Sequence, residues 1–561
     1  MGSMLLPNAE RPRLMVQVIE EKAQWQGNET FMRYPTPDWQ EEGFRTITWS
    51  QFADAVNKMA YWLDNQLGKS RDQDTIAYLG PSDPRYSIMI PAAIKTSRKL
   101  FIPDGRVTSE GLDSLVRSAE CSIWLHAEGS KYRAGLGENT GLRFLNVPTI
   151  AWMLDSEEYK PYPYLKTFEE ARFDQVLVIH TSGTTGFPKP IYHTNGFYSA
   201  WSSCLHLSQK YWPKGTSFDA WVGKMILTAC PPQWLGGLHS YIFGPIFMNI
   251  STTIAPPGVV GLPPDIFKSV LKHNKIDGIH CPPQVVHELY KEKSTKSLLE
   301  SLEFIIFLGA TLDRDIGDDL CRHTRVIPLI GSTENGPQVD LPPVDRELWY
   351  THAYAPENGN RMIHVPDSSI AGGGSEGLYE LALERAADGQ PNVHQCAFWN
   401  PMHRDISIIH TNELYTPLKD KDGSTRWNFV TRKDDLTKLS WLAKFHAQDL
   451  EGKFLRHPDV RNVFVGGQGR PTPFVIIEPN GAVRDFDQAS SLILKLYEEV
   501  IKKGNEECVT EIGIPKHTII LTKPGKPLKR NAKSGINRRA AEEDYAGEIE
   551  EAYHILAKLA D

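Results

Sequence analysis

Residues 181–189 read Thr-Ser-Gly-Thr-Thr-Gly-Phe-Pro-Lys and follow directly on an apolar run at residues 176–179. The apolar run predicts a buried strand, and the segment after it predicts a tight loop ending in a lysine. Two glycines let backbone N–H groups approach phosphate oxygens, while four hydroxyls and Lys189 add donors and a positive charge. The candidate phosphate contacts are Thr181, Ser182, Gly183, Thr184, Thr185, Gly186 and Lys189. A nucleotide triphosphate is the expected ligand, and a flexible surface loop is the alternative.

This loop differs from the common phosphate loop G-x-x-x-x-G-K-[ST], because Lys189 follows Pro188 and no Ser or Thr comes next. In the common form that hydroxyl binds Mg²⁺. A metal ligand is therefore expected elsewhere in the chain.

Length and composition limit the kinds of protein that this chain can be. Its 561 residues predict about three or four domain-sized units. A formal net charge of -8 and the lack of a basic run with interleaved aromatics argue against a nucleic-acid partner. No apolar stretch is long enough for a membrane helix, and the N-terminus does not read as a secretory signal. Seven scattered cysteines without a C-x-x-C pair favour a reducing compartment, and we expect a cytoplasmic protein.

Short apolar runs alternate with helical patterns from about residue 174 to residue 334, which predicts an α/β fold around a largely parallel sheet. The predicted strands are residues 176–179, 225–229, 253–255, 304–308 and 326–330. The pattern restarts after residue 432 with helices near 448–455 and 488–503 and strands at 460–465, 473–477 and 518–521. We therefore expect a large N-terminal domain, residues 1–432, and a small α+β C-terminal domain, residues 433–561.

The loop at 181–189 resembles the phosphate-loop signature of the adenylate-forming superfamily, which includes acyl-CoA synthetases, luciferases and nonribosomal-peptide-synthetase adenylation domains. The resemblance implies a multi-lobed N-terminal α/β domain and a mobile C-terminal domain. It also implies ATP and Mg²⁺ as cofactors.

A second segment, Ile330-Gly331-Ser332-Thr333-Glu334, resembles the superfamily's Y-G-x-T-E motif. By that resemblance Gly331, Ser332 and Thr333 lie near the nucleotide and Glu334 binds Mg²⁺. The adenine-stacking aromatic of the family is replaced by Ile330. A buried structural glutamate is the alternative for Glu334.

The family binds the ribose with the aspartate of T-G-D-L and the arginine of G-R-x-D. Here the corresponding segments are Thr411-Asn412-Glu413-Leu414 and Thr431-Arg432-Lys433-Asp434. The resemblance implies that Glu413 and Arg432 bind the ribose and that Asp434 is the hinge between the two domains.

The C-terminal segment resembles adenylation domains of fungal nonribosomal-peptide-synthetase-like and aminoadipate-reductase-like proteins, in which K-G-T precedes R, Y, E-I and Y. Here Lys533 is followed by Arg538, Tyr545, Glu548 and Tyr553. The match makes Lys533 the catalytic lysine, whose charge would stabilise the reacting anions. Lys526 is the second candidate, and a cluster of surface lysines is the alternative for both.

The acid is expected to bind near residues 231–237, where the family places an aromatic or a histidine. Trp234 would form the wall, and its neighbour Leu235 stands where relatives that activate amino acids carry an aspartate. This favours an aryl, aryl-keto or other carboxylic acid without an α-amino group. Further wall candidates, each of which could instead pack in the core, are His280, Cys281, Gly309, Ala310 and Thr311.

The predicted function is ATP-dependent activation of a small-molecule carboxylic acid as an acyl-adenylate, with release of pyrophosphate. Candidate acceptors are the thiol of CoA or of a phosphopantetheine on a carrier-protein domain, or an amine or hydroxyl. Leu442, where the family has a glycine beside the thiol tunnel, keeps the last two open. A catalytically impaired nucleotide-binding relative without enzymatic activity is the alternative.

Overall fold

The computed structural model describes most of the 561 residues, and the chain divides into two compact units. The described residues are 12–70, 73–105, 107, 109–129, 136, 141–155, 159–181, 188–211, 214–259, 261–365, 377–387, 389, 391–433, 436–440, 444–481, 483, 485–506, 512–530 and 536–560. The first unit comprises Met1–Arg361, Leu383–Ile409 and Leu418–Trp427, and the second comprises Met362–Ala382, His410–Pro417 and Asn428–Asp561. The boundary expected between residues 432 and 433 stays a prediction.

The first unit contains a seven-stranded sheet that runs parallel from β13 to β1 and ends in the antiparallel strand β2. In spatial order its strands are β13 (Arg325–Leu329), β12 (Phe304–Leu308), β11 (Gly278–Cys281), β9 (Met225–Thr228), β10 (Ser251–Ile254), β1 (Thr30–Pro35) and β2 (Phe44–Thr48). The sequence correctly predicted β9, β10, β12 and β13 and did not identify β11, β1 or β2.

A six-stranded sheet of the same unit is parallel except for its last pair, β7 and β8, which are antiparallel. Its strands are, in spatial order, β6 (Arg143–Asn146), β5 (Cys121–His126), β3 (Thr75–Leu79), β4 (Lys99–Phe101), β7 (Gln175–Thr181) and β8 (Lys189–Thr194). The predicted strand at 176–179 is thus the centre of β7.

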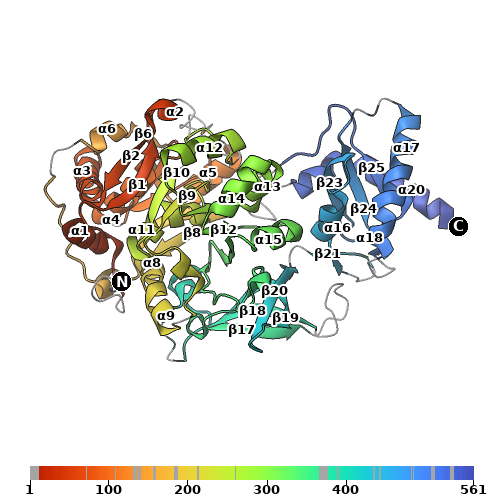
Figure 1. Ribbon diagram of the computed structural model, residues 1–561. Helices are drawn as coiled ribbons and strands as arrows, with labels where there is room; N and C mark the ends of the chain where they lie inside the picture. Colours follow the sequence, from red (N-terminus) through yellow and green to blue (C-terminus); the bar gives the residue numbers. More distant parts are fainter. Residues whose placement is uncertain are drawn as a thin grey trace. The chain divides into compact units, whose positions relative to one another are not determined.

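The helices of the first unit follow the strands in α/β alternation (Figure 1). They are α1 (Met15–Trp25), α2 (Trp39–Glu42), α3 (Trp49–Leu67), α4 (Arg85–Lys95), α5 (Ser109–Ser118), α6 (Ile150–Met153), α7 (Phe168–Ala171), α8 (Asn195–Ser202), α9 (Cys204–Lys210), α10 (Leu235–Leu238), α11 (Gly244–Phe247), α12 (Pro264–His273), α13 (Pro283–Lys291), α14 (Lys293–Ser301) and α15 (Arg314–Leu320). A π-helical turn, η3 (His239–Phe243), joins α10 to α11. None of the helices in the described ranges combines the length and apolar character that a membrane span requires.

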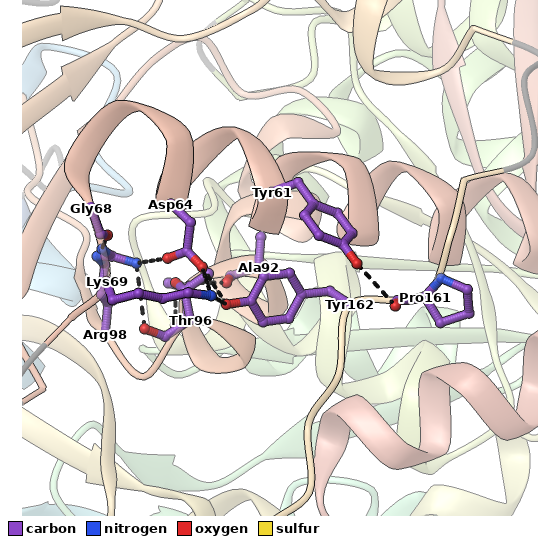
Figure 2. A network of polar contacts seen from close by, with 10 residues as sticks. Tyr61, Asp64, Gly68, Lys69, Ala92, Thr96, Arg98, Pro161 and Tyr162 are labelled. Atoms are coloured by element: carbon purple, nitrogen blue, oxygen red, sulfur yellow. Dashed lines mark hydrogen bonds and ion pairs between the residues drawn. The ribbon is translucent and has the colours of Figure 1, made fainter.

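The end of α3 is anchored by a polar network around Asp64 (Figure 2). Its carboxylate accepts hydrogen bonds from Arg98, 3.0 Å away, from Lys69 and from the hydroxyl of Tyr162. Burial alone would raise the pKa of Asp64, but the hydrogen bonds from Lys69, Tyr162 and Arg98 outweigh it and hold that pKa below its usual range. The network thus connects Arg98 and Tyr162, which are distant in sequence, to the C-terminal end of α3.

The second unit contains a three-stranded sheet with the order β23-β24-β25, and Figure 1 shows helices α16, α17, α18 and α20 around it. Its strands are β23 (Val460–Gly466), β24 (Phe474–Pro479) and β25 (Ile519–Leu521), and a short hairpin pairs β21 (Leu436–Lys438) with β22 (Lys444–His446). Its helices are α16 (Ala447–Phe454), α17 (Phe486–Leu496), α18 (Lys502–Glu506), α19 (Arg538–Asp544) and α20 (Ala546–Ala560). The strands and helices that the sequence predicts after residue 432 are confirmed.

Four further strands precede this region in the sequence and neighbour one another in the order β20-β19-β18-β17. They are β17 (Asn360–Val365), β18 (Leu378–Glu384), β19 (Ile408–Lys419) and β20 (Thr425–Arg432). Strands β19 and β20 carry the two predicted ribose ligands.

Candidate nucleotide and acid site

The parallel strands β9, β11, β12 and β13 end at one edge of the seven-stranded sheet. Ligands of open α/β sheets usually bind at the carboxyl ends of the strands, where the connecting segments begin. The segments after β9, β12 and β13 contain Trp234, Gly309 and Glu334, respectively. The fold therefore gathers three separately predicted site segments at this edge.

Strands β7 and β8 form an antiparallel hairpin whose connection is the predicted phosphate loop. Thr181, the last residue of β7, pairs in register with Lys189, the first residue of β8. Thr181 is half-buried and Lys189 is exposed. The hairpin thus holds both ends of the loop together. Ser182, Gly183, Thr184, Thr185 and Gly186 lie outside the described residues.

The Thr333-Glu334 segment is the turn of a second, very short hairpin, formed by β14 (Gly331–Ser332) and β15 (Gly336–Pro337). A Cβ atom on Gly331 would lie 2.6 Å from the carbonyl oxygen of Gly336, so only glycine fits there. The hydroxyl of Ser332 accepts a 3.1 Å hydrogen bond from the backbone N–H of Asn335. This hydrogen bond gives Ser332 a structural role in the turn. Its position near the nucleotide stays a prediction.

Two side chains that the sequence analysis did not identify hold the backbone of this turn. Nε2 of the buried His193 lies 2.7 Å from the carbonyl oxygen of Thr333, and its Nδ1 lies 2.6 Å from the hydroxyl of Tyr198. The amide of Asn400 donates a 2.9 Å hydrogen bond to the carbonyl oxygen of Glu334. Because a carbonyl only accepts, Nε2 of His193 carries the proton and Nδ1 accepts from Tyr198.

Burial lowers the pKa of His193 to about 4, and the hydrogen bond to Thr333 opposes that shift. The imidazole is therefore neutral near pH 7. The carboxylate of Glu334 is half-buried, and within the described ranges it forms no hydrogen bond or ion pair. Its backbone is fixed while its oxygens stay available for a cation.

The predicted acid wall lies beside the carboxyl edge of the sheet. Trp234 precedes the first turn of α10, and its Nε1 donates a 3.4 Å hydrogen bond to the buried carboxylate of Asp104. A Cβ atom on Gly236 would lie 2.1 Å from Cδ1 of Leu308, so α10 packs closely on the end of β12. Leu235 is half-buried.

The other wall candidates have different environments. Gly309 adopts a positive φ of 85° after β12, and Ala310 and Thr311 are exposed. His280 and Cys281 are both fully buried, but Cys281 packs in a separate apolar core with Ile279, Ile305 and Phe307. Side chains of a strand alternate between its faces, so His280 points to the opposite face of the sheet.

Glu413 lies on β19 in the second unit, and its carboxylate accepts a 3.0 Å hydrogen bond from the hydroxyl of Tyr415. The preceding Asn412 has a positive φ of 62°. It stands where the family motif has glycine, and Asn is one of the few other residues that tolerate this conformation. Arg432, the last residue of the neighbouring strand β20, is half-buried.

The backbone before Glu413 is anchored by a carboxylate that the sequence analysis did not identify. Glu380, 3% exposed, accepts hydrogen bonds from Lys433 at 2.8 Å, from His410 at 2.9 Å and from the backbone N–H of Asn412 at 3.3 Å. Burial alone would raise the pKa of Glu380, but Lys433 and His410 outweigh it and lower that pKa. An ionised Glu380 therefore stabilises the left-handed residue of the motif.

Lys533, Asp434 and Leu442 lie outside the described residues, so their roles stay predictions. Lys526, the second candidate for the catalytic lysine, lies 3.2 Å from a carboxylate oxygen of Glu548 and 4.2 Å from the ring centre of Tyr545. Glu548 also pairs with Lys523 at 2.7 Å. These contacts give Lys526 a structural role in the C-terminal motif.

Two family models match the chain. The model described as AMP-binding enzyme matches residues 19–360, and the model described as AMP-binding enzyme C-terminal domain matches residues 434–557.

Curated relatives match almost the whole chain at low identity. A carboxylic acid reductase of Neurospora crassa is 25% identical over 97% of this chain and 51% of its own length. The isocyanide synthase-NRPS hybrid crmA of Aspergillus fumigatus is 26% identical over 96% of this chain and 33% of its own length. The chain thus spans about half of the reductase and about a third of the hybrid. None of these findings supports the alternative of a non-enzymatic relative.

Solved structures establish the fold. The o-succinylbenzoate CoA synthetase MenE of Bacillus subtilis, solved with the acyl-adenylate OSB-AMP, gives a TM-score of 0.65 at 16% identity, covering 94% of this chain and 98% of its own. The anthranilate CoA ligase AuaEII, solved with anthranoyl-AMP, gives 0.67 at 15% identity, covering 96% and 98%. The predicted fold class is confirmed. Since the AMP-binding enzyme model covers more than half of the chain, the chain belongs to the AMP-binding enzyme family, the adenylate-forming superfamily that its phosphate-loop motif indicates.

Proposed function

We propose that this chain uses ATP to convert a carboxylic acid into an acyl-adenylate with release of pyrophosphate. The observation that supports this most is the arrangement in the first unit. A hairpin closes the phosphate loop between Thr181 and Lys189, and His193 and Asn400 fix the backbone that carries Glu334. Together these groups supply phosphate donors and a metal ligand.

In the proposed reaction a carboxylate oxygen of the acid attacks the α-phosphorus of ATP. The new bond joins that oxygen to phosphorus, the bond to the β-phosphate oxygen breaks, and pyrophosphate leaves with the bonding electrons. Thr181 to Lys189 would bind the phosphates, and Glu413 and Arg432 would bind the ribose. Lys533 would lie between the two reacting anions and stabilise the charge as it moves.

Mg²⁺ fits this set of residues. It commonly binds one or two carboxylates together with substrate phosphates, and when bound it neutralises phosphate charge. Glu334 offers an oxygen ligand of the right kind, with no ion pair in the described ranges to compete for it. Glu334 and the phosphates of ATP would therefore be enough to bind Mg²⁺, without a second protein carboxylate.

The acid that we propose is an aryl, aryl-keto or other carboxylic acid without an α-amino group. Trp234 and the aliphatic Leu235 offer no charge partner for an ammonium group. Against these two side chains an ammonium group lacks a charge partner, and the nearby carboxylate of Asp104 already accepts a hydrogen bond from Nε1 of Trp234.

The acceptor is proposed to be a thiol, either of CoA or of a carrier-protein domain. The similarity to an isocyanide synthase-NRPS hybrid supports the thiol of a carrier-protein domain over that of CoA. An amine or hydroxyl acceptor is the second proposal, because Leu442 stands where the family has a glycine beside the thiol tunnel. A cytoplasmic location stays a prediction from the cysteine content.

Exchange of labelled pyrophosphate into ATP tests the adenylation half-reaction without an acceptor. The panel contains aryl, aryl-keto, fatty and amino acids. We expect one class of acid without an α-amino group to support exchange in the parent and Lys533→Ala to lower the rate by about 100-fold or more. Lys529→Ala, which removes a surface ion pair with Asp544, is the matched control and should keep parental activity. Equal rates for the parent and Lys533→Ala would remove Lys533 from the site, and no exchange with any acid would argue against the proposed function.

A further inference from the structure

Four buried aromatic side chains of the first unit form one contact group, the ring cluster: Trp201, Trp221, His239 and His280. The ring centre of His239 lies 5.3 Å from that of Trp201, 4.9 Å from that of Trp221 and 5.5 Å from that of His280. None of the four is more than 2% exposed. Each has one ring nitrogen without a hydrogen-bond partner in the described part of the chain: Nε1 of both tryptophans, Nδ1 of His239 and Nε2 of His280.

Buried polar atoms in folded proteins almost always have a hydrogen-bond partner, so four such nitrogens in one contact group need an explanation. Leaving one unsatisfied destabilises the folded protein. Tryptophan and histidine side chains that served only to fill the core could be replaced by apolar residues without this cost. The four nitrogens are therefore unused hydrogen-bonding capacity that a bound polar group would satisfy.

The ring cluster adjoins the predicted acid wall in both sequence and structure. His280 belongs to β11, one residue before its carboxyl end, and its side chain faces away from the core that contains Cys281. His239 begins the π-helical turn η3 directly after α10, the helix that Trp234 precedes. Single π-helical turns occur frequently at functional sites.

The hydrogen-bonding capacity of the rings defines what can bind there. Nε2 of His239 lies 3.4 Å from the thioether sulfur of Met248, which only accepts, so Nδ1 of His239 is an acceptor. Indole nitrogens only donate. Nδ1 of His280 lies 2.7 Å from the hydroxyl of Ser240, which leaves its Nε2 available. The cluster thus offers donors and an acceptor, and its partner must both accept and donate.

The partner must also be uncharged. Burial lowers the pKa of His280 to about 3 and that of His239 well below its usual value, so both imidazoles are neutral near pH 7. Neutral imidazoles and indoles give a buried carboxylate or ammonium no opposite charge, and burying an unpaired charge is costly. A hydroxyl or a carboxamide satisfies both requirements.

We propose that the ring cluster binds a neutral hydroxyl or carboxamide at the end of the acid remote from its carboxylate, and so selects the acid. This proposal rests on the proposed function, because it assigns one end of the same acid site. Ordered water has the same hydrogen-bonding chemistry, and the experiment separates the two sources.

The test compares matched acids in pyrophosphate exchange. Each pair has the same skeleton and carries either a hydroxyl or a methyl at the remote end, in the aryl, aryl-keto and fatty series. Sites built to hydrogen-bond a substrate hydroxyl reject the analogue that lacks it strongly. We expect the parent to prefer the hydroxylated acid of the active series by about 100-fold or more in kcat/KM.

The variant His239→Leu removes the acceptor nitrogen and puts an apolar side chain of roughly similar size in its place. It should lose at least about 10-fold of this preference, a ratio that does not depend on the variant's overall activity. Tyr241→Phe is the matched control, because it removes a buried hydroxyl from the same π-helical turn but outside the ring cluster. It should keep the parental preference. If His239→Leu does not fold, Trp221→Phe serves as the second variant, because it removes one indole N–H of the ring cluster.

An active parent that prefers neither the hydroxylated acid nor the carboxamide of the same skeleton over the methyl acid would overturn the inference and favour ordered water at the cluster. So would an unchanged preference in both His239→Leu and Trp221→Phe. If none of the acids supported exchange, the result would contradict the proposed function and also this inference, which rests on it. The outcomes therefore distinguish failure of the specificity proposal from failure of adenylation.

Discussion

Two predicted ligand carboxylates, Glu334 in the first unit and Glu413 in the second, are held in different ways. At Glu334 the anchors act on the backbone: His193 bonds the carbonyl oxygen of Thr333, and Asn400 bonds that of Glu334 itself. At Glu413 the carboxylate itself accepts from Tyr415. A backbone anchor leaves carboxylate oxygens for a metal, whereas a side-chain anchor orients a carboxylate that accepts from hydroxyls. We therefore expect Glu334 to bind a metal ion and Glu413 to accept hydrogen bonds from ribose hydroxyls.

The largest expected effect follows from removing the charge at the first carboxylate. Glu334→Gln keeps the size of the side chain and the backbone anchors but weakens binding of Mg²⁺. We expect pyrophosphate exchange to fall by about 100-fold or more, with partial recovery at raised Mg²⁺ concentration and little change in thermal stability. Parental exchange in Glu334→Gln would show that the proposed metal ligand lies elsewhere.

A smaller effect is expected from removing the backbone anchor. His193→Leu leaves the carbonyl of Thr333 and the hydroxyl of Tyr198 without their partner, which should lower the free energy of unfolding by about 2–4 kcal/mol. Exchange should fall by about 10-fold, since the turn that carries Glu334 loses one of its two anchors. His193→Gln, whose amide can replace one hydrogen bond, should recover part of both. Chemical denaturation and exchange rates measure the two effects separately.

The same residue predicts a pH dependence. In the folded protein the pKa of His193 is about 4, below its unfolded value of about 6.5, so the unfolded chain binds more protons between these values. Stability from this residue is complete above pH 6.5 and is lost as the pH falls toward 4, by about 3 kcal/mol. His193→Gln should therefore show a shallower loss of stability in acid than the parent. Identical slopes would contradict the neutral, buried imidazole.

The smallest effect is expected at the second carboxylate. Tyr415→Phe removes the hydroxyl that orients Glu413 and should raise the KM for ATP by about 2- to 5-fold, with kcat nearly unchanged. A nucleotide without ribose hydroxyls should show no difference between this variant and the parent. A change in kcat alone would argue that Glu413 acts in the chemical step and not in binding the ribose.

Local sequence features explain why much of the fold was predictable. Apolar runs and helical periodicity identified β9, β12 and β13 and the elements after residue 432, since each depends on a few adjacent residues. Short motifs also identified Thr333, Glu334 and Glu413 as candidates, because a family resemblance applies to contiguous residues.

The anchors of these residues could not be predicted in this way. His193 is separated from Thr333 by 140 positions, and Asn400 from Glu334 by 66. Glu380 lies 53 positions before Lys433 and on another strand from Asn412. The ring cluster likewise joins residues from separate segments. Such contacts depend on tertiary packing, and no local pattern in the sequence indicates them.

The most direct test of the account follows an oxygen atom from the acid to the nucleotide. The acid that supports exchange is labelled with oxygen-18 in its carboxylate and incubated with ATP and Mg²⁺, and the nucleotide products are analysed by mass spectrometry. Attack of the carboxylate on the α-phosphorus predicts unlabelled pyrophosphate and an acyl-adenylate; cleavage of its acyl–oxygen bond by added hydroxylamine, which takes the acyl group, then releases AMP that carries one oxygen-18 atom. Formation of ADP with label in inorganic phosphate, or of AMP without label, would contradict acyl-adenylate formation by this chain.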